Sequence, residues 1–351
     1  MLRCSLPPRM TALALLVAAL TTGPASAAPI VTTERIAGID RYETAAAISR
    51  ATFVDGIAGN TVLARGDDFP DALAGSHLAG FYGPGSVLLT GRDSLHPAAL
   101  AEIERRSGAS TVFLVGDVEA ISATVEADLL SRGFNVSRIG GPDRYNTARR
   151  VAGAAPDGGT VAFLTSGERF ADAIAAGPFA YPVDGPYIYL TPSGSLHPET
   201  RLAIDERGTR EIIIVGGTQA VSAAVEAELR SICYPTLPGS PCLAVLRIAG
   251  GDRAETATLL ADHFAGQRGD PYTHVNLARG DTFPDALGGA PHGGTEDAPT
   301  LFTQSPTELG ESTREWLAAH ADEIESIHVF GDAEAVSDAV VEEARLAATA
   351  G

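Results

Sequence analysis

The sequence has no lysine, few cysteines and a single tryptophan. Its 25 basic residues other than histidine are all arginines and face 44 acidic residues, which gives a net charge of −19. This charge argues against nucleic-acid binding and against non-specific adhesion to anionic membranes, because both need a surplus of basic groups. With 45% hydrophobic and 20% charged residues, the composition is that of a globular chain, which excludes long disordered or collagen-like segments.

Long apolar runs are also scarce. Arg3 and Arg9 precede an apolar run over 11–20, and small residues in an A-x-A arrangement follow up to Ala27. The run is about half of the ~20 residues that a membrane span needs, so it predicts a cleaved signal peptide over 1–27. No later apolar span or stop-transfer cluster follows. We therefore expect a secreted protein with no membrane anchor in the mature chain.

Two cysteines remain after that cleavage, Cys233 and Cys242. In an oxidising compartment we expect them to form a disulfide across the 234–241 loop, which would contribute up to about 3 kcal/mol. The alternative is a pair of free thiols in a flexible loop.

The most informative feature is a threefold internal repeat. One phrase, R-I-x-G-x-D-R-Y-x-T-A, recurs at spacings of 103 and 109 residues (138 minus 35, and 247 minus 138). Its copies begin at Arg35, Arg138 and Arg247. A second phrase of the form G-D-x-F-P-D-A-L begins at Gly66, Gly167 and Gly280. A strand ending in Thr and a glycine turn leading to A-[IV]-S follow in every copy. We therefore divide the chain into modules over 28–135, 136–244 and 245–351.

Each module alternates apolar runs with amphipathic stretches. The runs 61–64, 87–89 and 112–115 do not alternate in polarity, which is typical of strands buried on both faces. The stretches 42–53, 72–81, 97–106 and 121–132 predict helices between them. This order predicts an α/β fold of three tandem Rossmann-like modules, each a small parallel sheet of four or five strands flanked by helices. The strand at 138–139 could close the first module or open the second.

Both repeated phrases fall where a strand leads into a helix, the place where parallel sheets bind ligands. We assign their aspartates a structural role, as helix caps or as negative charges in a first helical turn. The expected caps are Asp40, Asp143 and Asp252, and the first-turn residues are Asp71, Asp172 and Asp285.

The repeated arginines are harder to explain by helix formation, because a helix N-terminus does not favour a cation. Each could pair with an aspartate and tie the loop to the F-P-D motif of its own module. Alternatively, each could present an anion-binding fork beside exposed backbone amides. The candidate polymer-binding or anion-binding residues are Arg41, Arg144, Arg253, Arg65 and Arg279.

These ordered motifs resemble the cell-wall-binding repeat 2 family, over about all of the chain after residue 27. The resemblance implies Gram-positive surface proteins whose three modules pack as a pseudo-threefold triangle. It also implies non-covalent attachment to an anionic cell-wall glycopolymer or a peptidoglycan-linked glycan, often beside an effector domain. This sequence shows no effector domain, so the expected role is binding alone. Ala254 replaces the motif tyrosine and Arg169 an acidic residue, which argues against equal affinity in the three modules.

Other chemistries fit less well. The segment Ser94-Leu95-His96-Pro97 recurs at 195–198 but not in the third module, and no G-x-S-x-G elbow is present. A serine cap before a helix that begins with proline therefore explains these residues better than a hydrolase active site. The eight histidines lack metal-ligand spacing, and we expect no metal or other cofactor. A divalent cation held by Asp67, Asp68 and Asp71 would not be repeated in the second module.

We therefore expect a secreted, monomeric, non-catalytic protein that binds wall polymers. Three weak sites on one body could gain roughly 10²–10⁴ in avidity. The net charge of −19 opposes an anionic polymer, so local arginine geometry, divalent cations or a neutral glycan would be needed. The alternatives are a secreted wall-acting hydrolase or esterase, and a surface adhesion or structural protein with a protein partner.

Overall fold

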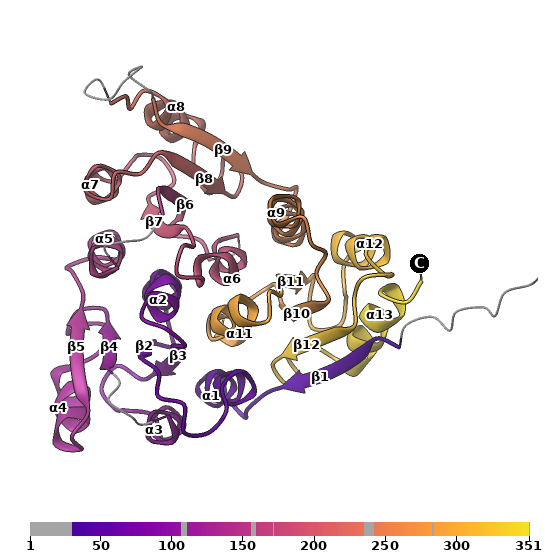
Figure 1. Cartoon of the computed structure of the whole chain (residues 1–351), viewed down its shortest axis with the longest axis horizontal. Coiled ribbons are helices and arrows are strands. Elements are labelled where there is room, and N and C mark those ends of the chain that lie inside the picture. Colours follow the sequence, from indigo (N-terminus) through magenta and orange to yellow (C-terminus); the bar gives the residue numbers. More distant parts are fainter. Residues whose placement is uncertain are drawn as a thin grey trace, which may run out of the picture.

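The computed structural model describes residues 30–106, 111–155, 159–170, 172–234, 242–282 and 284–350. The expected signal peptide over 1–27 lies outside these ranges. The described chain forms three four-stranded parallel sheets flanked by helices and arranged as a triangle (Figure 1). The prediction of three small parallel α/β modules in a pseudo-threefold arrangement is confirmed.

All three sheets have the same strand order. The first is β3 (Ser86–Thr90), β2 (Thr61–Arg65), β4 (Thr111–Val115) and β5 (Asn135–Ile139). The second is β7 (Tyr187–Thr191), β6 (Val161–Ser166), β8 (Glu211–Val215) and β9 (Ala244–Ile248). The third is β11 (Thr300–Thr303), β10 (His274–Arg279), β12 (Ser326–Phe330) and β1 (Thr32–Ile36). The first strand of the chain thus completes the last sheet, in parallel register with β12.

The helices follow the same plan in each module. The first module contains α1 (Arg41–Thr52), α2 (Pro70–Phe81), α3 (Pro97–Arg105) and α4 (Ala123–Ser131). The second contains α5 (Arg144–Ala154), the 3₁₀ turn η1 (Ala173–Ala176), α6 (Gly177–Ala180), α7 (Pro198–Glu206) and α8 (Ala223–Arg230). The third contains α9 (Arg253–Arg268), α10 (Pro284–Leu287), α11 (Ala290–Thr295), α12 (Glu311–Ala319) and α13 (Asp338–Ala347). Among these helices none is long and apolar enough to cross a membrane.

The first repeated phrase joins neighbouring modules. Its strand closes one sheet, and its helix packs on the next sheet: β5 lies in the first sheet, whereas α5 packs against β7 of the second. In the same way α9 packs against β11 and α1 against β3. The last strands of the first and second sheets end at Ile139 and Ile248. The strand that sequence analysis left open at 138–139 closes the first module.

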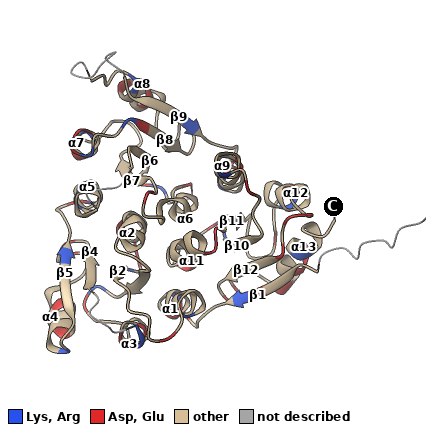
Figure 2. Cartoon of the chain, viewed as in Figure 1, with Lys and Arg blue, Asp and Glu red and all other residues tan. Residues whose placement is uncertain are grey.

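The arginine that begins each phrase fixes this edge strand in place. Arg138 donates to the carbonyls of Gly116 and Asp117, both at 3.1 Å, and pairs with Glu126. Arg35 and Arg247 make corresponding bonds to the glycine turns of the third and second sheets. Figure 2 shows these positions as basic segments near the ends of β1, β5 and β9. Because each guanidinium has several donors, one side chain satisfies the carbonyls of a whole turn.

The centre of the triangle is formed by α2, α6 and α11, which contact one another. Neither α6 nor α11 contains Asp, Glu, Lys or Arg, so both helices are tan in Figure 2. Small residues allow the close approach: a Cβ on Gly177 would lie 2.9 Å from the Cβ of Ala290. The three modules therefore share one apolar centre and form a single rigid body.

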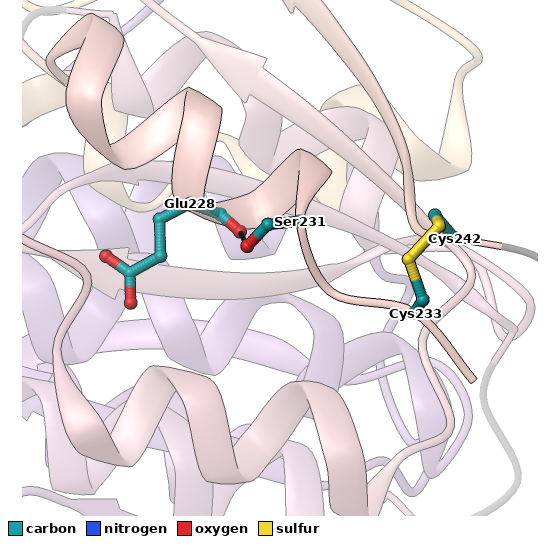
Figure 3. Close-up of a disulfide and its surroundings, with 4 residues drawn as sticks. All are labelled: Glu228, Ser231, Cys233 and Cys242. Atoms are coloured by element: carbon teal, nitrogen blue, oxygen red, sulfur yellow. Dashed lines mark hydrogen bonds between the residues drawn. A yellow bond between two sulfur atoms is a disulfide. The ribbon is translucent and has the colours of Figure 1, made fainter. Parts of the chain in front are cut away.

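Cys233 and Cys242 form a disulfide, as predicted. It joins the chain just after α8 to the residues just before β9, next to a turn in which the Ser231 hydroxyl donates to the carbonyl of Glu228 at 2.6 Å (Figure 3). The bond thus holds the last strand of the second sheet close to the helix that precedes it. Residues 235–241 of the enclosed loop lie outside the described ranges.

Candidate functional site

The repeated phrases meet at three places, which we call junctions. The first junction lies at the carboxyl ends of β2 and β4, where the N-terminus of α5 arrives. The second lies at the carboxyl ends of β6 and β8 with α9, and the third at those of β10 and β12 with α1. These are the switch points of the sheets, because the chain leaves the two central strands in opposite directions.

Two of the junctions are hollow and acidic. The first encloses about 140 Å³, and its lining includes Arg65, Asp68, Asp71, Asp117, Glu119 and Arg144. The third encloses about 410 Å³, and its lining includes Asp40, Arg41, Arg279, Asp285, Asp332 and Glu334. Each crevice combines carboxylates with guanidinium groups, an arrangement that suits the hydroxyls of a polar ligand better than a single strong anion.

Three aspartates cap the helices that arrive at these junctions. The Asp40 carboxylate accepts from the amides of Tyr42 and Glu43 at 2.9 and 2.8 Å. Asp143 accepts from the amide of Asn146 at 2.7 Å, and Asp252 from that of Glu255 at 2.9 Å. Each bond satisfies an N–H group that the helix itself leaves without a partner.

The arginine after each cap reaches the G-D-x-F-P-D loop of its own module. Arg41 donates to the carbonyl of Gly66 at 2.7 Å, and Arg144 and Arg253 donate to those of Gly167 and Gly280. The loop carbonyl is the acceptor, in place of the aspartate that sequence analysis proposed. Arg144 alone makes a second bond, to Asp68 of the preceding module at 3.1 Å. Within the described residues Arg41 and Arg253 therefore keep donors for a ligand.

Arg65 and Arg279 are already engaged. Arg65 makes two parallel bonds to Asp67, at 2.5 and 2.7 Å, and Arg279 makes two to Asp281, both at 2.7 Å. These pairs raise the pKa of each arginine and lower that of each aspartate, mainly through the side-chain hydrogen bonds. A ligand anion would have to displace the aspartate, which belongs to the same loop, from the guanidinium group.

The first-turn aspartates point to the neighbouring glycine turns. A Cβ on Gly116 would lie 2.7 Å from Asp71 Oδ2, and Gly216 and Gly331 stand in the same relation to Asp172 and Asp285. Each glycine has a positive φ, at +118°, +112° and +102° respectively, so the turn needs glycine for two reasons.

Burial governs the titration of these three carboxyls. Loss of solvent is the main reason that the pKa of Asp71 rises to about 7, and the charge of Asp68 adds to it. Burial also raises the pKa of Asp172 and Asp285, but side-chain hydrogen bonds with Thr256 and Thr44 oppose the increase. These three carboxyl groups are thus buried inside the junctions. A role in the first turn of a helix would not by itself require that burial.

The second junction differs in charge. Arg169, Gly217 and Gln219 occupy the positions of Asp68, Asp117 and Glu119 in the first. Arg169 is exposed, and both its charge and that of Arg253 act on Asp172 to lower its pKa. The second junction is therefore the least acidic of the three.

Sequence analysis did not identify an aromatic pair beside two of the junctions. Tyr42 stacks on His96 with ring centroids 4.5 Å apart, and Tyr145 on His197 at 4.3 Å. Both histidines also cap the next helix by accepting a backbone amide, so the expected serine cap is wrong. The sequence does contain a sign of this pair, because the third module lacks both the tyrosine and the histidine.

Hydrolase and metal chemistry would need particular contacts of the serines and of the His, Cys, Asp or Glu side chains. Among the described residues no hydrogen bond joins the Ser94 or Ser195 hydroxyl to a histidine, and both serines are exposed. Across the same ranges no three His, Cys, Asp or Glu side chains are placed to share a metal ion.

Comparison with known proteins decides the family. The model of cell wall binding domain 2 (CWB2) matches residues 35–126, 138–226 and 247–341. The chain belongs to the CWB2 family. Its three repeats cover most of the sequence, and the resemblance seen in the motifs is confirmed. Cell wall binding domains indicate a location at the cell surface.

The CWB2 chain is also similar to curated proteins of Bacillus subtilis (strain 168). It is 30% identical to N-acetylmuramoyl-L-alanine amidase LytC over 73% of this chain and 47% of that protein. It is 28% identical to a protein named amidase enhancer, over 78% of this chain and 35% of that one. The chain thus spans about half, or less, of the length of these relatives.

Solved structures share the fold. Cwp8 from Clostridium difficile superposes with a TM-score of 0.78 at 24% identity, over 92% of this chain and 52% of that one. Cwp6 from the same organism gives 0.73 at 22% identity, over 89% and 48%. At these identities the similarity establishes the arrangement of the three sheets.

Proposed function

We propose that this CWB2 chain is a secreted, non-catalytic protein that attaches without covalent bonds to a glycopolymer of a Gram-positive cell wall. The observation that carries the proposal is the presence of three family repeats whose junctions belong to one packed body. A repetitive polymer can contact all three, so weak contacts combine into an avidity gain of roughly 10²–10⁴. The family match supports the wall as the target, and a glycopolymer as the ligand is our proposal.

The second junction is the best place for an anionic group of that polymer. It lacks the carboxylates that Asp117 and Glu119 supply at the first junction, and it adds the exposed Arg169. Arg253 has only the Gly280 carbonyl as a hydrogen-bond acceptor in the described chain, and its guanidinium carbon lies 5.7 Å from the ring centroid of Phe170, so its other N–H groups have no acceptor there. Two guanidinium groups at one junction suit a phosphate or carboxylate, whereas the crevices of the first and third junctions suit hydroxyls.

This distribution answers the objection raised by the net charge of −19. The long-range repulsion is screened beyond about 8 Å at physiological ionic strength. Within that distance the ligand meets the local charge of a crevice, not the charge of the whole chain. Arg41 would contribute at the third junction, and Arg144, Arg65 and Arg279 less, because carboxylates already occupy their donors.

Co-sedimentation with isolated Gram-positive walls tests the proposal. The walls are used intact and after acid extraction of their secondary polymers, and the fraction of protein bound is measured at several salt concentrations. The double variant Arg169→Ala/Arg253→Ala is expected to bind at least about tenfold more weakly than the wild type, because each lost charge-assisted bond is worth about 1.5–3 kcal/mol.

A matched control removes the same number of positive charges at positions outside the junctions. Arg201 and Arg230 form exposed ion pairs on α7 and α8, away from the junctions, so Arg201→Ala/Arg230→Ala should bind like the wild type. Binding that survives extraction would point to peptidoglycan or a protein partner. Failure to bind intact walls, or turnover of wall material that depends on Ser94 or Ser195, would overturn the proposal.

A further inference from the structure

A cavity of about 380 Å³ lies between the second and third modules, away from the junction crevices. Its lining includes Val161 and Glu211, the first residues of β6 and β8, so it opens at the amino ends of these strands. The repeated phrases all lie at the carboxyl ends. The cavity is therefore separate from the sites discussed above, and no repeated motif accounts for it.

The corresponding space is filled in the other two modules. Phe113 of the first module is covered by Tyr82, which stacks on it at 5.3 Å and donates to the carbonyl of Ala154 at 2.6 Å. In the third module His292 packs against His328 at 4.6 Å between ring centroids.

The second module has Ile213 at the matching position, and this residue lines the cavity although it is itself buried. Val183, which aligns with Tyr82, is 57% exposed and is not part of the cavity lining. The cavity is thus not forced by the fold, since the same backbone plan is closed elsewhere by one aromatic side chain.

The cavity has an apolar wall and a polar rim. The wall includes Ile213, Pro178, Pro182 and the partly buried rings of Phe179 and Phe264, which stack on each other at 4.5 Å. This combination of flat apolar surface and a few polar groups is typical of small-ligand sites.

The rim is predominantly acidic. Arg268 pairs with Asp297 at 3.0 Å, and the exposed Gln267 lies beside them. Asp184 and Glu211 have no cationic partner among the ion pairs of the described residues. Asp297 is also the one described residue other than glycine with a positive φ, at +53°.

We propose that this cavity binds a pyranose unit that carries no negative charge. The C–H face of a sugar ring can pack on the phenylalanine and proline surfaces, while the carboxylates and the Gln267 amide bond its hydroxyls or an amino group. The two carboxylates without a cation would repel a phosphate or uronate. The proposal rests on the proposed function in one respect: it names the neutral part of the wall glycan as the ligand, whereas the junction crevices take the remainder.

Saturation-transfer NMR with the purified protein tests the cavity directly, since it detects weak sugar binding. The probes are N-acetyl-D-glucosamine and D-glucosamine, and D-glucuronate serves as the anionic control. We expect saturation transfer to at least one of the first two and none to glucuronate. Equal transfer to all three, or transfer to none, would overturn the proposal.

Two variants locate the binding. Ile213→Phe introduces the residue of the first module into the cavity and should abolish the signal. Because Ile213 is buried, the second variant changes only exposed rim residues: Asp184→Ala/Gln267→Ala should bind roughly five- to tenfold more weakly and keep the wild-type unfolding curve. Val54→Ala, an exposed position outside the cavity lining, should leave the signal unchanged. Unchanged binding in both cavity variants would contradict the assignment.

Wall sedimentation separates this inference from the proposed function. If the wild type binds walls but neither sugar binds the cavity, the inference fails and the wall function stands. If the sugars bind and the wild type ignores walls, the cavity is a sugar site and the wall function fails.

Discussion

The first and second junctions are built from the same phrases but differ at both edges of their sheets. At the carboxyl edge the first junction has Asp68, Asp117 and Glu119, whereas the second has Arg169 and two uncharged residues. At the opposite, amino edge of the sheets, Tyr82 covers Phe113 in the first module, whereas a cavity of about 380 Å³ borders the second. The comparison separates what the fold needs, which is retained in both, from what a ligand would select.

The retained features are backbone devices. In each junction a capping aspartate begins the arriving helix, an arginine ties it to a loop carbonyl, and a buried aspartate lies against a glycine with positive φ. The variable features are side chains at the crevice mouths. Changes to the first set should affect stability in both junctions, and changes to the second set should affect binding.

The largest expected effect is on the shared glycine turn. Gly116→Ala and Gly216→Ala should each lower the free energy of unfolding by roughly 2–3 kcal/mol, because the new Cβ meets a carboxylate and the φ is unfavourable. Urea unfolding measures both. As a control, Gly153→Ala on α5 has open space around the added Cβ and should not destabilise. A loss of stability in only one of the two variants would show that the two junctions do not both depend on this glycine turn.

The next effect concerns the buried carboxyls. Because the pKa of Asp71 is raised to about 7, the folded state holds this proton more tightly than the unfolded chain, and stability falls as the pH rises from about 4 to about 7. Asp71→Asn removes that loss and should be more stable than the wild type above pH 7 by about 1–3 kcal/mol, with little difference near pH 4.

Asp172→Asn sharpens the comparison. Its side-chain hydrogen bond with Thr256 favours the charged form, so the gain in stability at high pH should be smaller than for Asp71→Asn. Unfolding curves at pH 4.5 and pH 8 measure both variants. Asp93→Asn, an exposed position, should show neither gain. A larger gain at Asp172 than at Asp71 would contradict the stated cause of the two shifts.

Much of this architecture was predictable from the sequence. Buried strands such as 112–115 and the helices between them follow from apolar runs and cap residues, and the repeat fixed their number. The closure of the third sheet by β1 did not follow, because pairing partners are set by contacts between distant residues. Arg138 does indicate where its strand belongs, because an arginine at the end of a strand needs hydrogen-bond acceptors. It finds them in the glycine turn of the same sheet.

The candidate site was predictable only in part. The caps at Asp40 and its copies follow from helix chemistry, whereas the bidentate pairing of Arg65 with Asp67 depends on loop geometry that spacing does not give. The cavity beside Ile213 could not be predicted, because the sequence alone does not show that Val183, which aligns with Tyr82, is exposed and lies outside the cavity lining.

A smaller effect is expected at Tyr82, which covers Phe113 at the amino edge of the first sheet. Tyr82→Val introduces the residue that the second module has there and should cost about 1–2 kcal/mol, since the ring is 46% exposed and loses its stacking on Phe113 and its bond to Ala154. Val183→Ala should have almost no effect, because that side chain is exposed. Thermal unfolding of both variants measures the difference in stability. Equal losses of stability would mean that Tyr82 does not stabilise the amino edge of the first sheet.

The smallest expected effect lies at the carboxyl edge of the first junction. Asp68→Thr introduces the residue of the third module and frees the Arg144 donor that Asp68 now occupies. If the crevices bind wall polymer, this variant should bind intact walls about two- to fivefold more tightly, because one exposed ion pair is worth no more than about 1 kcal/mol. Asp93→Thr removes an equal charge outside the junction lining and should bind like the wild type. Equal gains in both variants would assign the change to net charge, and weaker binding by Asp68→Thr would make Asp68 itself a ligand contact, consistent with a crevice selected for hydroxyls.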